Sequence, residues 1–349
     1  MEQVNSNANP KLNGDSNLKN LENLENLENS DDLVAVSVIL PVLNEERYLE
    51  SAVNAIVQQD FKGQLEIILS IGPSKDRTLE IAEKLAGNDS RLKIVDNPTG
   101  KTAAGLNLAI KNSKFPVIVR VDGHANLEPN YISTAIKLLK ETGAVNVGGL
   151  MAAEGLNPFE KAVARAMRSP LGVGSAKFHT GGEAGFVDTV YLGVFRRDAL
   201  LAAGGFDERF TRAQDWELNF RLRQQGGKIY FDPKLKVTYR PRASFSALAK
   251  QYFEYGRWRR VVTRTHKGTI NYRYLAPPLT VLGVICSLIG SFINSILILP
   301  AAIYFAFILM AAFAIGKSPR EVLFLPWVLF TMHFSWGVGF LTSSKRLIR

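Results

Sequence analysis

Residues 275–316 form a run of 42 positions without a charged side chain, and this run limits the possible folds more than any other feature. A helix that crosses a bilayer needs roughly 20 consecutive apolar residues. The run is long enough for two spans separated near Pro300, and a second uncharged stretch at residues 322–344 is long enough for a third. We therefore expect a transmembrane region of two to three helices at residues 275–349.

Positive charge gathers directly before the first apolar run. Residues 236–273 contain ten Lys or Arg and one acid, Glu254, which accounts for nearly all of the net charge of +10. Basic residues beside a span mark its cytoplasmic side and attract anionic lipid head groups. A nucleic-acid surface is disfavoured because the patch adjoins a membrane segment. We expect membrane lipids and no nucleic acid as partners, and a multi-pass protein of the inner (plasma) membrane whose soluble domain is cytoplasmic.

Residues 244–274 combine aromatic and basic side chains at helical spacing, which predicts an amphipathic helix that lies in the membrane interface. Three complete spans would place the basic C-terminus, residues 345–349, on the side opposite the soluble domain. That arrangement conflicts with the tendency of basic segments to stay in the cytoplasm. Either the last apolar stretch is re-entrant, or the tendency fails in this chain.

The rest of the chain divides into a tail and one large domain. Residues 1–33 are polar and repeat Leu-Glu-Asn three times, so we expect a disordered tail that buries too little apolar surface to fold. Residues 34–243 alternate strand-like apolar runs with helical patterns, which predicts one α/β domain. The single cysteine, Cys286, lies within the first apolar run, and an intrachain disulfide is excluded.

Four apolar runs, at residues 34–40, 65–71, 92–95 and 117–122, are expected as buried strands of a doubly wound, mostly parallel sheet. Ligands bind such sheets just beyond the carboxyl ends of the strands. The fourth run ends at Asp122-Gly123-His124, where a carboxylate and an imidazole at one turn can share a divalent ion. Taken alone, an Asp-Gly turn that closes a strand is an equally good interpretation.

Several further motifs follow these strands in a fixed order. They are Pro41-Val42-Leu43-Asn44-Glu45, Gly100-Lys101-Thr102, Asp122-Gly123-His124, Gly204-Gly205-Phe206-Asp207 and Gln214-Asp215-Trp216. Together they resemble the inverting glycosyltransferases of family 2, over about residues 34–262. The similarity is greatest to membrane-attached enzymes of the succinoglycan-biosynthesis type, and it implies the nucleotide-sugar-binding fold called GT-A.

The resemblance implies a donor pocket at the first two turns. Pro41, Asn44 and Glu45 would line the space for the base and ribose of the nucleotide, although Asn44 is equally suited to cap the following helix. At the second turn Gly72 stands where relatives carry an acidic residue, so the identity of the base is open. Asp76 either replaces that carboxylate or caps the next helix.

The segment after the third strand would approach the diphosphate of the donor. Lys101 would offset phosphate charge, and Asn107 would face the nucleotide; a solvated lysine at a helix start is the alternative for Lys101. Asp122 and His124 would hold Mn²⁺ or Mg²⁺, with the imidazole nitrogen favouring Mn²⁺. The ion would stabilise the leaving nucleoside diphosphate.

On the acceptor side, the resemblance assigns Asp215 as the general base that takes the proton of the acceptor hydroxyl. Gln214 and Trp216 would contact the acceptor. An ordinary carboxylate in the first turn of a helix is the alternative for Asp215, and Glu217 is the competing base. The Gly-rich residues 172–185 are expected to form a mobile loop that closes over the substrates, with His179 as a ligand or a packing residue.

Gln251, Arg257 and Trp258 resemble the Gln-x-x-Arg-Trp motif of related synthases, which holds the acceptor end and diphosphate. The spacing between the glutamine and the arginine is longer here. These three residues are expected to bind the acceptor.

The expected function is metal-dependent, inverting transfer of a sugar from a nucleotide-sugar donor to a polyprenyl-diphosphate-linked saccharide, in exopolysaccharide or cell-surface polysaccharide synthesis. Other polysaccharide-assembly proteins are further expected partners. Three alternatives remain open: a sugar-phospholipid synthase, a non-catalytic membrane scaffold that retains the fold, and a basic lipid-binding protein without nucleotide affinity.

Overall fold

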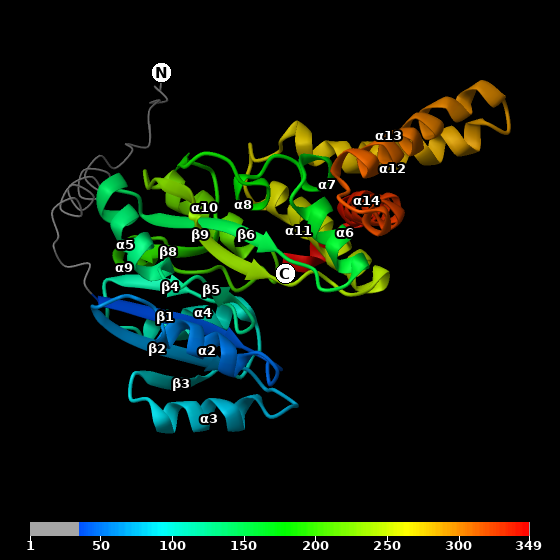
Figure 1. Cartoon of the computed structure of the whole chain (residues 1–349). Coiled ribbons are helices and arrows are strands. Elements are labelled where there is room, and N and C mark those ends of the chain that lie inside the picture. Colours follow the sequence, from blue (N-terminus) through cyan, green and yellow to red (C-terminus); the bar gives the residue numbers. More distant parts are fainter. Residues whose placement is uncertain (1–34, 349) are drawn as a thin grey trace, which may run out of the picture.

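The computed structural model describes residues 35–348. The tail expected at residues 1–33 lies outside these residues. Within them, an α/β body carries a helical C-terminal region, part of which projects far from the body (Figure 1).

Nine strands of the described residues form one mixed sheet, in the order β3-β2-β1-β4-β8-β6-β9-β5, with β7 added to β9. The four strands expected from sequence are confirmed and pair in parallel as β3-β2-β1-β4. Beyond β4 the sheet changes direction, because β8 runs antiparallel to both β4 and β6. The strands are β1 (Ala35–Val42), β2 (Gln64–Ile71), β3 (Leu92–Asp96), β4 (Val117–Arg120), β5 (Asn126–Leu127), β6 (Asn146–Ala153), β7 (Gly185–Phe186), β8 (Tyr191–Arg196) and β9 (Ile229–Tyr239).

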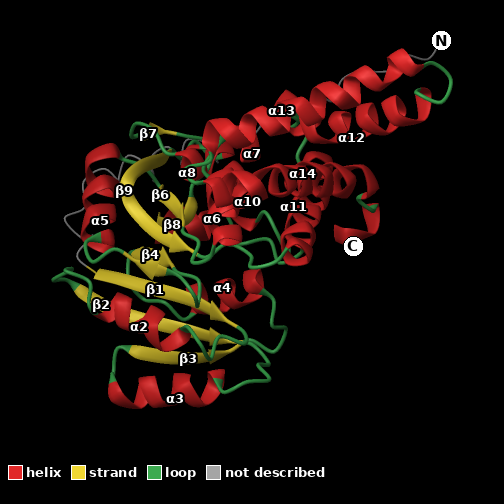
Figure 2. Cartoon of the chain, turned by 45° about the vertical axis from the view of Figure 1, so that its right-hand side comes forward, coloured by secondary structure: helices red, strands yellow, loops and turns green. Residues whose placement is uncertain are grey.

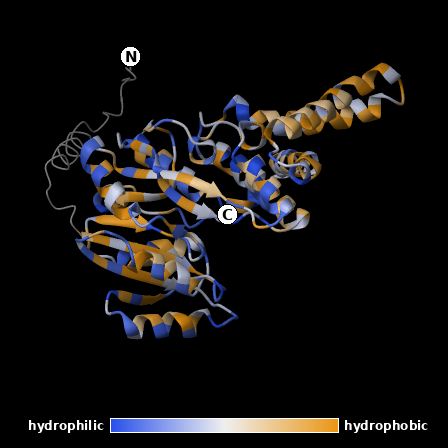
Figure 3. Ribbon diagram, in the orientation of Figure 1, coloured by the Kyte–Doolittle hydropathy of each residue, from blue (hydrophilic) through white to orange (hydrophobic). Residues whose placement is uncertain are grey.

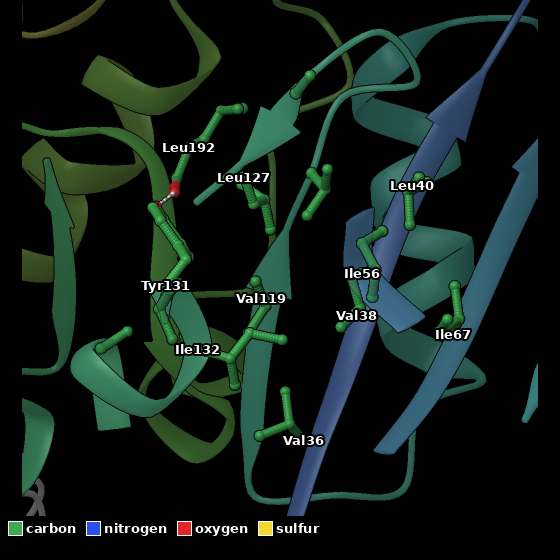
Figure 4. Close-up of a cluster of buried hydrophobic side chains, with 14 of the residues drawn as sticks. Val36, Val38, Leu40, Ile56, Ile67, Val119, Leu127, Tyr131, Ile132 and Leu192 are labelled. Atoms are coloured by element: carbon green, nitrogen blue, oxygen red, sulfur yellow. Dashed lines mark hydrogen bonds between the residues drawn. The ribbon is translucent and has the colours of Figure 1, made fainter. Parts of the chain in front are cut away.

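Both faces of β1, β2 and β4 are buried, as their continuous apolar runs predict, whereas β3 at the edge of the sheet is largely exposed. Val36, Val38 and Leu40 of β1 pack on one face with helices α2, α3 and α5, and Figure 4 shows part of this cluster. Ile39 faces the other side, where α4, α9 and α10 pack. The covering helices are α2 (Leu49–Val57), α3 (Thr78–Asn88), α4 (Thr102–Lys111), α5 (Tyr131–Thr142), α9 (Arg197–Ala202) and α10 (Gln214–Gln224).

A second cluster joins the body to the C-terminal helices. Three helices of the described residues are long and apolar enough to cross a membrane. Two of them, α12 and α13, form the projecting pair, and most of their residues are hydrophobic (Figure 3). At the far end of the pair, Phe292 and Ile293 are 92% and 88% exposed. The remaining elements are α6 (Pro158–Met167), α7 (Pro170–Val173), α8 (Lys177–Thr180), α11 (Phe245–Thr265), α12 (Tyr272–Gly290), η1 (Ser295–Ile298), α13 (Leu299–Ile315), α14 (Pro319–Thr342) and η2 (Lys345–Ile348).

The third apolar helix, α14, lies differently. It appears nearly end-on in Figure 1, where α12 and α13 run across the picture, and it packs along α11 beside the body (Figure 2). A Cβ atom on Gly256 of α11 would lie 1.9 Å from the carbonyl oxygen of Trp336, so this contact requires glycine. Glu321 of α14 is buried and its Oε2 lies 3.1 Å from Nε of Arg165 in α6.

Candidate active site

The fourth strand places a charged cluster at the carboxyl edge of the sheet. Arg120 is the last residue of β4 and is only 5% exposed. Its Nη2 donates to Oδ1 of Asp122 over 3.1 Å. Asp122 lies just past the strand end, where its side chain keeps 21% exposure. The strand thus buries a cation and leaves a carboxylate accessible beside it.

The same guanidinium reaches the carboxylate of Asp215, which lies 95 positions later in the chain. Nη1 of Arg120 donates to Oδ1 of Asp215. Asp215 is in the first turn of α10, and Ala213 before it has a left-handed backbone, with φ of 62°. Residues other than glycine rarely adopt this left-handed conformation, and those that do are often found at functional sites. Asp122 and Asp215 are therefore brought to two sides of one arginine.

Burial dominates the electrostatics of this cluster. It raises the pKa of Asp215 above its ordinary value, and the attraction of Arg120 offsets only part of this shift. Burial alone would lower the pKa of Arg120, but Asp215 and Asp122 raise it above its ordinary value. A carboxylate with a raised pKa is a stronger proton acceptor when it is ionised. Arg120 supplies the positive charge that keeps two neighbouring carboxylates compatible.

His124 meets a residue from the neighbouring strand. Its Nδ1 lies 2.8 Å from Oε1 of Glu45, which follows the end of β1. Strands β1 and β4 are parallel neighbours, so the turns after them meet at one edge of the sheet. The hydrogen bond with Glu45 raises the pKa of His124. The turn after β1 therefore contacts the expected metal ligand directly.

Within residues 35–348, no group of three or more His, Cys, Asp or Glu side chains could hold a metal ion. Asp122 and His124 still fit a site completed by donor phosphates, because each has accessible surface. Metal-binding histidines commonly donate their second ring nitrogen to a carboxylate, which is the arrangement of His124 and Glu45. The donor set of one carboxylate and one imidazole suits Mn²⁺ better than Mg²⁺.

The first two turns form one hydrogen-bonded unit beside this corner. The amide of Asn44 donates to Oγ of Ser74, and its Oδ1 accepts from the amide of Lys75 over 2.8 Å. Asp76 accepts from the amide of Thr78 and from the amide of Glu46. The capping alternatives are wrong for both residues, because the N-cap of α2 is Tyr48 and that of α3 is Arg77. Asn44 and Asp76 instead link the two turns, and their donor roles stay predictions.

Two other donor candidates lie in tightly packed backbone. Gly72 donates its amide to the carbonyl of Val42 over 2.8 Å, and a Cβ atom there would lie 3.1 Å from Cα of Gly100. Pro41 lies near the end of β1, next to Gly105 of α4. These contacts draw the turns after the first three strands together.

Lys101 and Asn107 have different surroundings. Lys101 is exposed and directly precedes α4. Asn107 donates through Nδ2 to the carbonyl of Phe206 and to Oε1 of Glu208, and its Oδ1 accepts from the amide of Phe206. Its amide thus fastens α4 to the Gly-Gly-Phe-Asp turn. Facing the nucleotide, as the resemblance implies, would require Asn107 to leave that turn.

The residues next to Asp215 in the first turn of α10 differ in burial and in their partners. Glu217, the competing base, is 1% exposed and binds Arg221 in two hydrogen bonds, so it points away from Arg120. Gln214 is also buried. Trp216 is partly exposed and stacks on Phe220, with 5.5 Å between ring centroids. Of the two acidic residues in this turn, only Asp215 joins the cluster.

The three acceptor candidates of α11 face different surroundings. Nε2 of Gln251 donates to the hydroxyls of Tyr239 and Tyr255, over 2.7 and 2.8 Å. Nη1 of Arg257 donates to Glu254 over 2.7 Å. Trp258 is 3% exposed and packs on Phe210 in a small hydrophobic cluster. All three residues thus already have partners within the protein, and their acceptor roles stay predictions.

Two residues of the cluster were not singled out from sequence. Arg120 interrupts a run of Val and Ile, and a charge inside a buried strand must be paired, so its position carried a usable signal. Tyr191 of β8 is the other. Burial and the nearby Asp122 raise its pKa, so it is a neutral hydroxyl. Nothing in its local sequence distinguishes it from a packing tyrosine.

The loop at residues 172–185 packs against the C-terminal helices. Lys177 donates to the carbonyl of Glu183, and Arg273 donates to Oγ of Ser175. Burial lowers the pKa of His179 to about 4, which makes its ring neutral, and the ring lies 4.3 Å from that of Phe178. These contacts agree with a packing role for His179, and closure of the loop stays a prediction.

Comparisons with known proteins agree with this fold. The sequence model of glycosyl transferase family 2 matches residues 37–202, which contain Asp122 and His124 but not Asp215. The succinoglycan biosynthesis protein ExoA of Rhizobium meliloti (strain 1021) is 29% identical over 317 residues, which are 89% of this chain and 96% of that protein. A second relative is the dolichyl N-acetyl-alpha-D-glucosaminyl phosphate 3-beta-D-2,3-diacetamido-2,3-dideoxy-beta-D-glucuronosyltransferase of Methanococcus voltae. It is 28% identical to this chain over 316 residues, which are 87% of this chain and 95% of that protein.

Among solved structures, the mannosyltransferase PcManGT from Pyrobaculum calidifontis in complex with GDP-Man and Mn²⁺ has a TM-score of 0.56. It is 18% identical to this chain, and the alignment covers 94% of this chain and 95% of the other. At this identity the likeness concerns the fold alone, which is the expected GT-A fold.

Proposed function

We propose that the chain is a glycosyltransferase of family 2 with the GT-A fold, and that it transfers a sugar from a nucleotide-sugar donor to a lipid-linked saccharide with inversion at the anomeric carbon. Its role in the synthesis of polysaccharides or glycoconjugates follows from the relatives it resembles over nearly their full length. The observation that carries the proposal is the bridge that Arg120 makes between Asp122 and Asp215.

The chemistry follows from the two sides of this bridge. The Asp215 carboxylate accepts the proton of the acceptor hydroxyl, whose oxygen forms a bond to the anomeric carbon. The bond from that carbon to the nucleoside diphosphate breaks at the same time, and a single displacement inverts the configuration. Arg120 keeps Asp215 oriented through its hydrogen bond. Tyr191 is partly buried, and Asp122 and Asp215 both add to the effect of burial in raising the pKa of its hydroxyl, which therefore stays neutral.

A divalent ion held by Asp122 and His124 would neutralise charge on the leaving diphosphate. The complex of PcManGT with GDP-Man and Mn²⁺ supports this choice of cofactor by analogy of fold. Glu45 holds the His124 ring in place, so that the other ring nitrogen remains for the metal.

The lipid-linked acceptor is supported by the apolar helices and by a relative. The relative from Methanococcus voltae is named for a dolichyl phosphate-linked sugar as its acceptor. Here the apolar pair α12 and α13 directly follows α11, which packs beside α10 and its Asp215. Attachment to the membrane would bring a lipid-linked saccharide to the base.

The experiment that tests the proposal is a transfer screen with purified, detergent-held, full-length protein. A panel of nucleotide sugars is supplied with Mn²⁺ or Mg²⁺ and a prenyl-diphosphate-linked monosaccharide, and products are identified by mass spectrometry. We expect transfer from one donor that requires the metal. Binding of a nucleotide sugar without any transfer would favour the scaffold alternative, and transfer to a lipid phosphate itself would favour a sugar-phospholipid synthase.

We infer that the protein is membrane-bound with its catalytic domain in the cytoplasm, and that α12 and α13 are the inserted hairpin. Helix α14 lies across this pair and buries the ion pair of Glu321 with Arg165, which a lipid-facing span would not favour. With two spans, Lys345 and Arg346 stay on the cytoplasmic side with the basic residues before α12, in line with the positive-inside tendency.

Cysteine accessibility tests this orientation. In a Cys286→Ser background, Ser344→Cys should be labelled by a membrane-impermeant maleimide only after the cells are opened. Ser291→Cys, at the far end of the hairpin, is the matched position expected at the outer surface. Labelling of Ser344→Cys in intact cells would support three spans instead.

A further inference from the structure

Arg259 of α11 is a cation without a carboxylate partner among the described residues. Its guanidinium carbon lies 4.9 Å from the ring centroid of Trp216 and 4.4 Å from that of Tyr274. Its Nη1 is buried and makes no hydrogen bond within residues 35–348. Burial lowers its pKa from the ordinary arginine value. The side chain thus keeps hydrogen-bonding capacity that the protein itself does not use.

The neighbouring arginines of this helix differ from Arg259. Arg257 pairs with Glu254 over 2.7 Å, and Arg264 donates to the carbonyl of Ser343 over 2.9 Å. Arg260 lies over the ring of Phe340 in α14. Arg259 is partly buried, and burying part of a guanidinium without a counter-charge is costly; aromatic rings offset only part of that cost. A bound anion would complete the site around Arg259.

The position of Arg259 indicates which anion. Trp216 directly follows Asp215 in α10, and Tyr274 lies in the first turn of α12, where the hairpin begins. Arg259 therefore lies where the base-bearing helix meets the root of the apolar pair. In a lipid-linked saccharide, the phosphate stands between the lipid chain and the sugar. A guanidinium between the base and the start of the apolar helices matches such a phosphate in charge and in geometry.

We propose that Arg259, held between Trp216 and Tyr274, binds the phosphate or diphosphate of a prenyl-linked acceptor and so sets the distance of its sugar from Asp215. This assignment deepens the proposed function and rests on it. From the sequence, Trp216 was expected to contact the acceptor. In this proposal the ring of Trp216 instead supports Arg259, and it also stacks on Phe220. Arg273 begins the hairpin beside Tyr274 and is an exposed second cation for the same anion.

Binding can be measured without knowledge of the sugar. Full-length protein in a neutral detergent is titrated with farnesyl diphosphate and with farnesol by calorimetry. The variants are Arg259→Gln, Arg259→Lys in case the glutamine variant folds poorly, and Arg260→Gln as the matched loss of charge on the other face of α11. We expect wild type and Arg260→Gln to prefer the diphosphate by about tenfold or more. Arg259→Gln should lose that preference, and Arg259→Lys should keep part of it.

Three results would overturn the assignment. The first is equal affinity of wild type and Arg259→Gln for farnesyl diphosphate. The second is an equal loss for farnesol and its diphosphate, which would reveal a packing role. The third is displacement of farnesyl diphosphate by detergent-solubilised phosphatidylglycerol but not by detergent-solubilised phosphatidylcholine, which would make the ligand a bulk phospholipid head group. Failure of sugar transfer in the donor screen would instead reject the proposed function, because this titration uses no donor.

Discussion

The two sides of Arg120 are built in different ways. On the donor side, Glu45, Asp122 and His124 follow directly after two neighbouring parallel strands, so the pairing of β1 with β4 brings them together. On the acceptor side, Asp215 is held by a helix that begins after a left-handed Ala213. Helices α11 and α12 add Arg259 and Tyr274 to that side from the end of the chain. Backbone topology fixes the first side, and packing of distant segments fixes the second.

This difference suggests that the two sides serve donor binding and transfer separately, and that mutations can affect one without the other. Changes on the donor side should weaken metal-dependent binding of the nucleotide sugar. Changes on the acceptor side should weaken transfer and leave donor binding intact. Arg120, which touches both carboxylates, should affect both.

The largest effect is expected for Asp215→Asn. An amide of the same shape can still accept a hydrogen bond from Arg120, but it cannot take a proton from the acceptor. We expect kcat for transfer to fall by about 10³-fold or more, since general-base catalysis contributes roughly 10²–10⁴-fold. Initial rates at saturating donor measure it, and Asp198→Asn, an exposed residue of α9, is the control. Near-normal turnover would remove the base assignment.

A smaller effect, on the other side, is expected for Asp122→Asn and His124→Ala. Loss of one ligand should weaken Mn²⁺-dependent donor binding by about 10–100-fold or more, since loss of even an outer-shell partner of a ligand typically has an effect of that size. Calorimetric titration of the nucleotide sugar with and without Mn²⁺ measures this. Chelation should weaken donor binding by wild type to the level of Asp122→Asn and have little further effect on that variant. Metal dependence that survives in both variants would contradict the assignment of these ligands.

The smallest effect is expected for Arg120→Lys, which keeps the charge but loses the planar fork that reaches two carboxylates. Donor affinity and kcat should each fall by about tenfold, because a lysine hydrogen-bonds one carboxylate well but not both. Arg197→Lys is a matched control, because Arg197 is the first residue of α9 and its Nη2 donates to the carbonyl of Ser113, before the start of β4. A variant that loses only donor binding, or only transfer, would show that the arginine serves one side alone.

The parallel part of the fold was predictable because its signals are local. The apolar runs of β1 to β4 and the turn at Asp122-Gly123-His124 are each read from a few neighbouring residues. The antiparallel position of β8 beside β4 was not predictable, because the direction and neighbour of a strand depend on pairing between distant segments. The three apolar helices were also predictable from composition. The crosswise packing of α14 depends on contacts such as Gly256 with Trp336, which appear only in three dimensions.

The candidate site, like the fold, was predictable from the sequence only in part. Asp122 and Asp215 could be named from their motifs, but the arginine between them could not be assigned without the structure. The motif places Asn107 at the nucleotide, which stays a prediction, and only the structure shows that its amide binds the turn at Phe206. Arg257 and Trp258 carry the motif in sequence, whereas the guanidinium beside the base-bearing helix belongs to Arg259. A helix presents its residues in directions that a motif with altered spacing does not preserve.

The central claim is that a sugar bound through Asp122 and His124 presents its anomeric carbon to Asp215. The most direct test is a structure of Asp215→Asn with the nucleotide sugar and Mn²⁺ bound. The account predicts the ion between Asp122, His124 and the diphosphate, with the anomeric carbon facing position 215 and room for one hydroxyl between them. A sugar that points away from position 215, or an ion held by other residues, would contradict it.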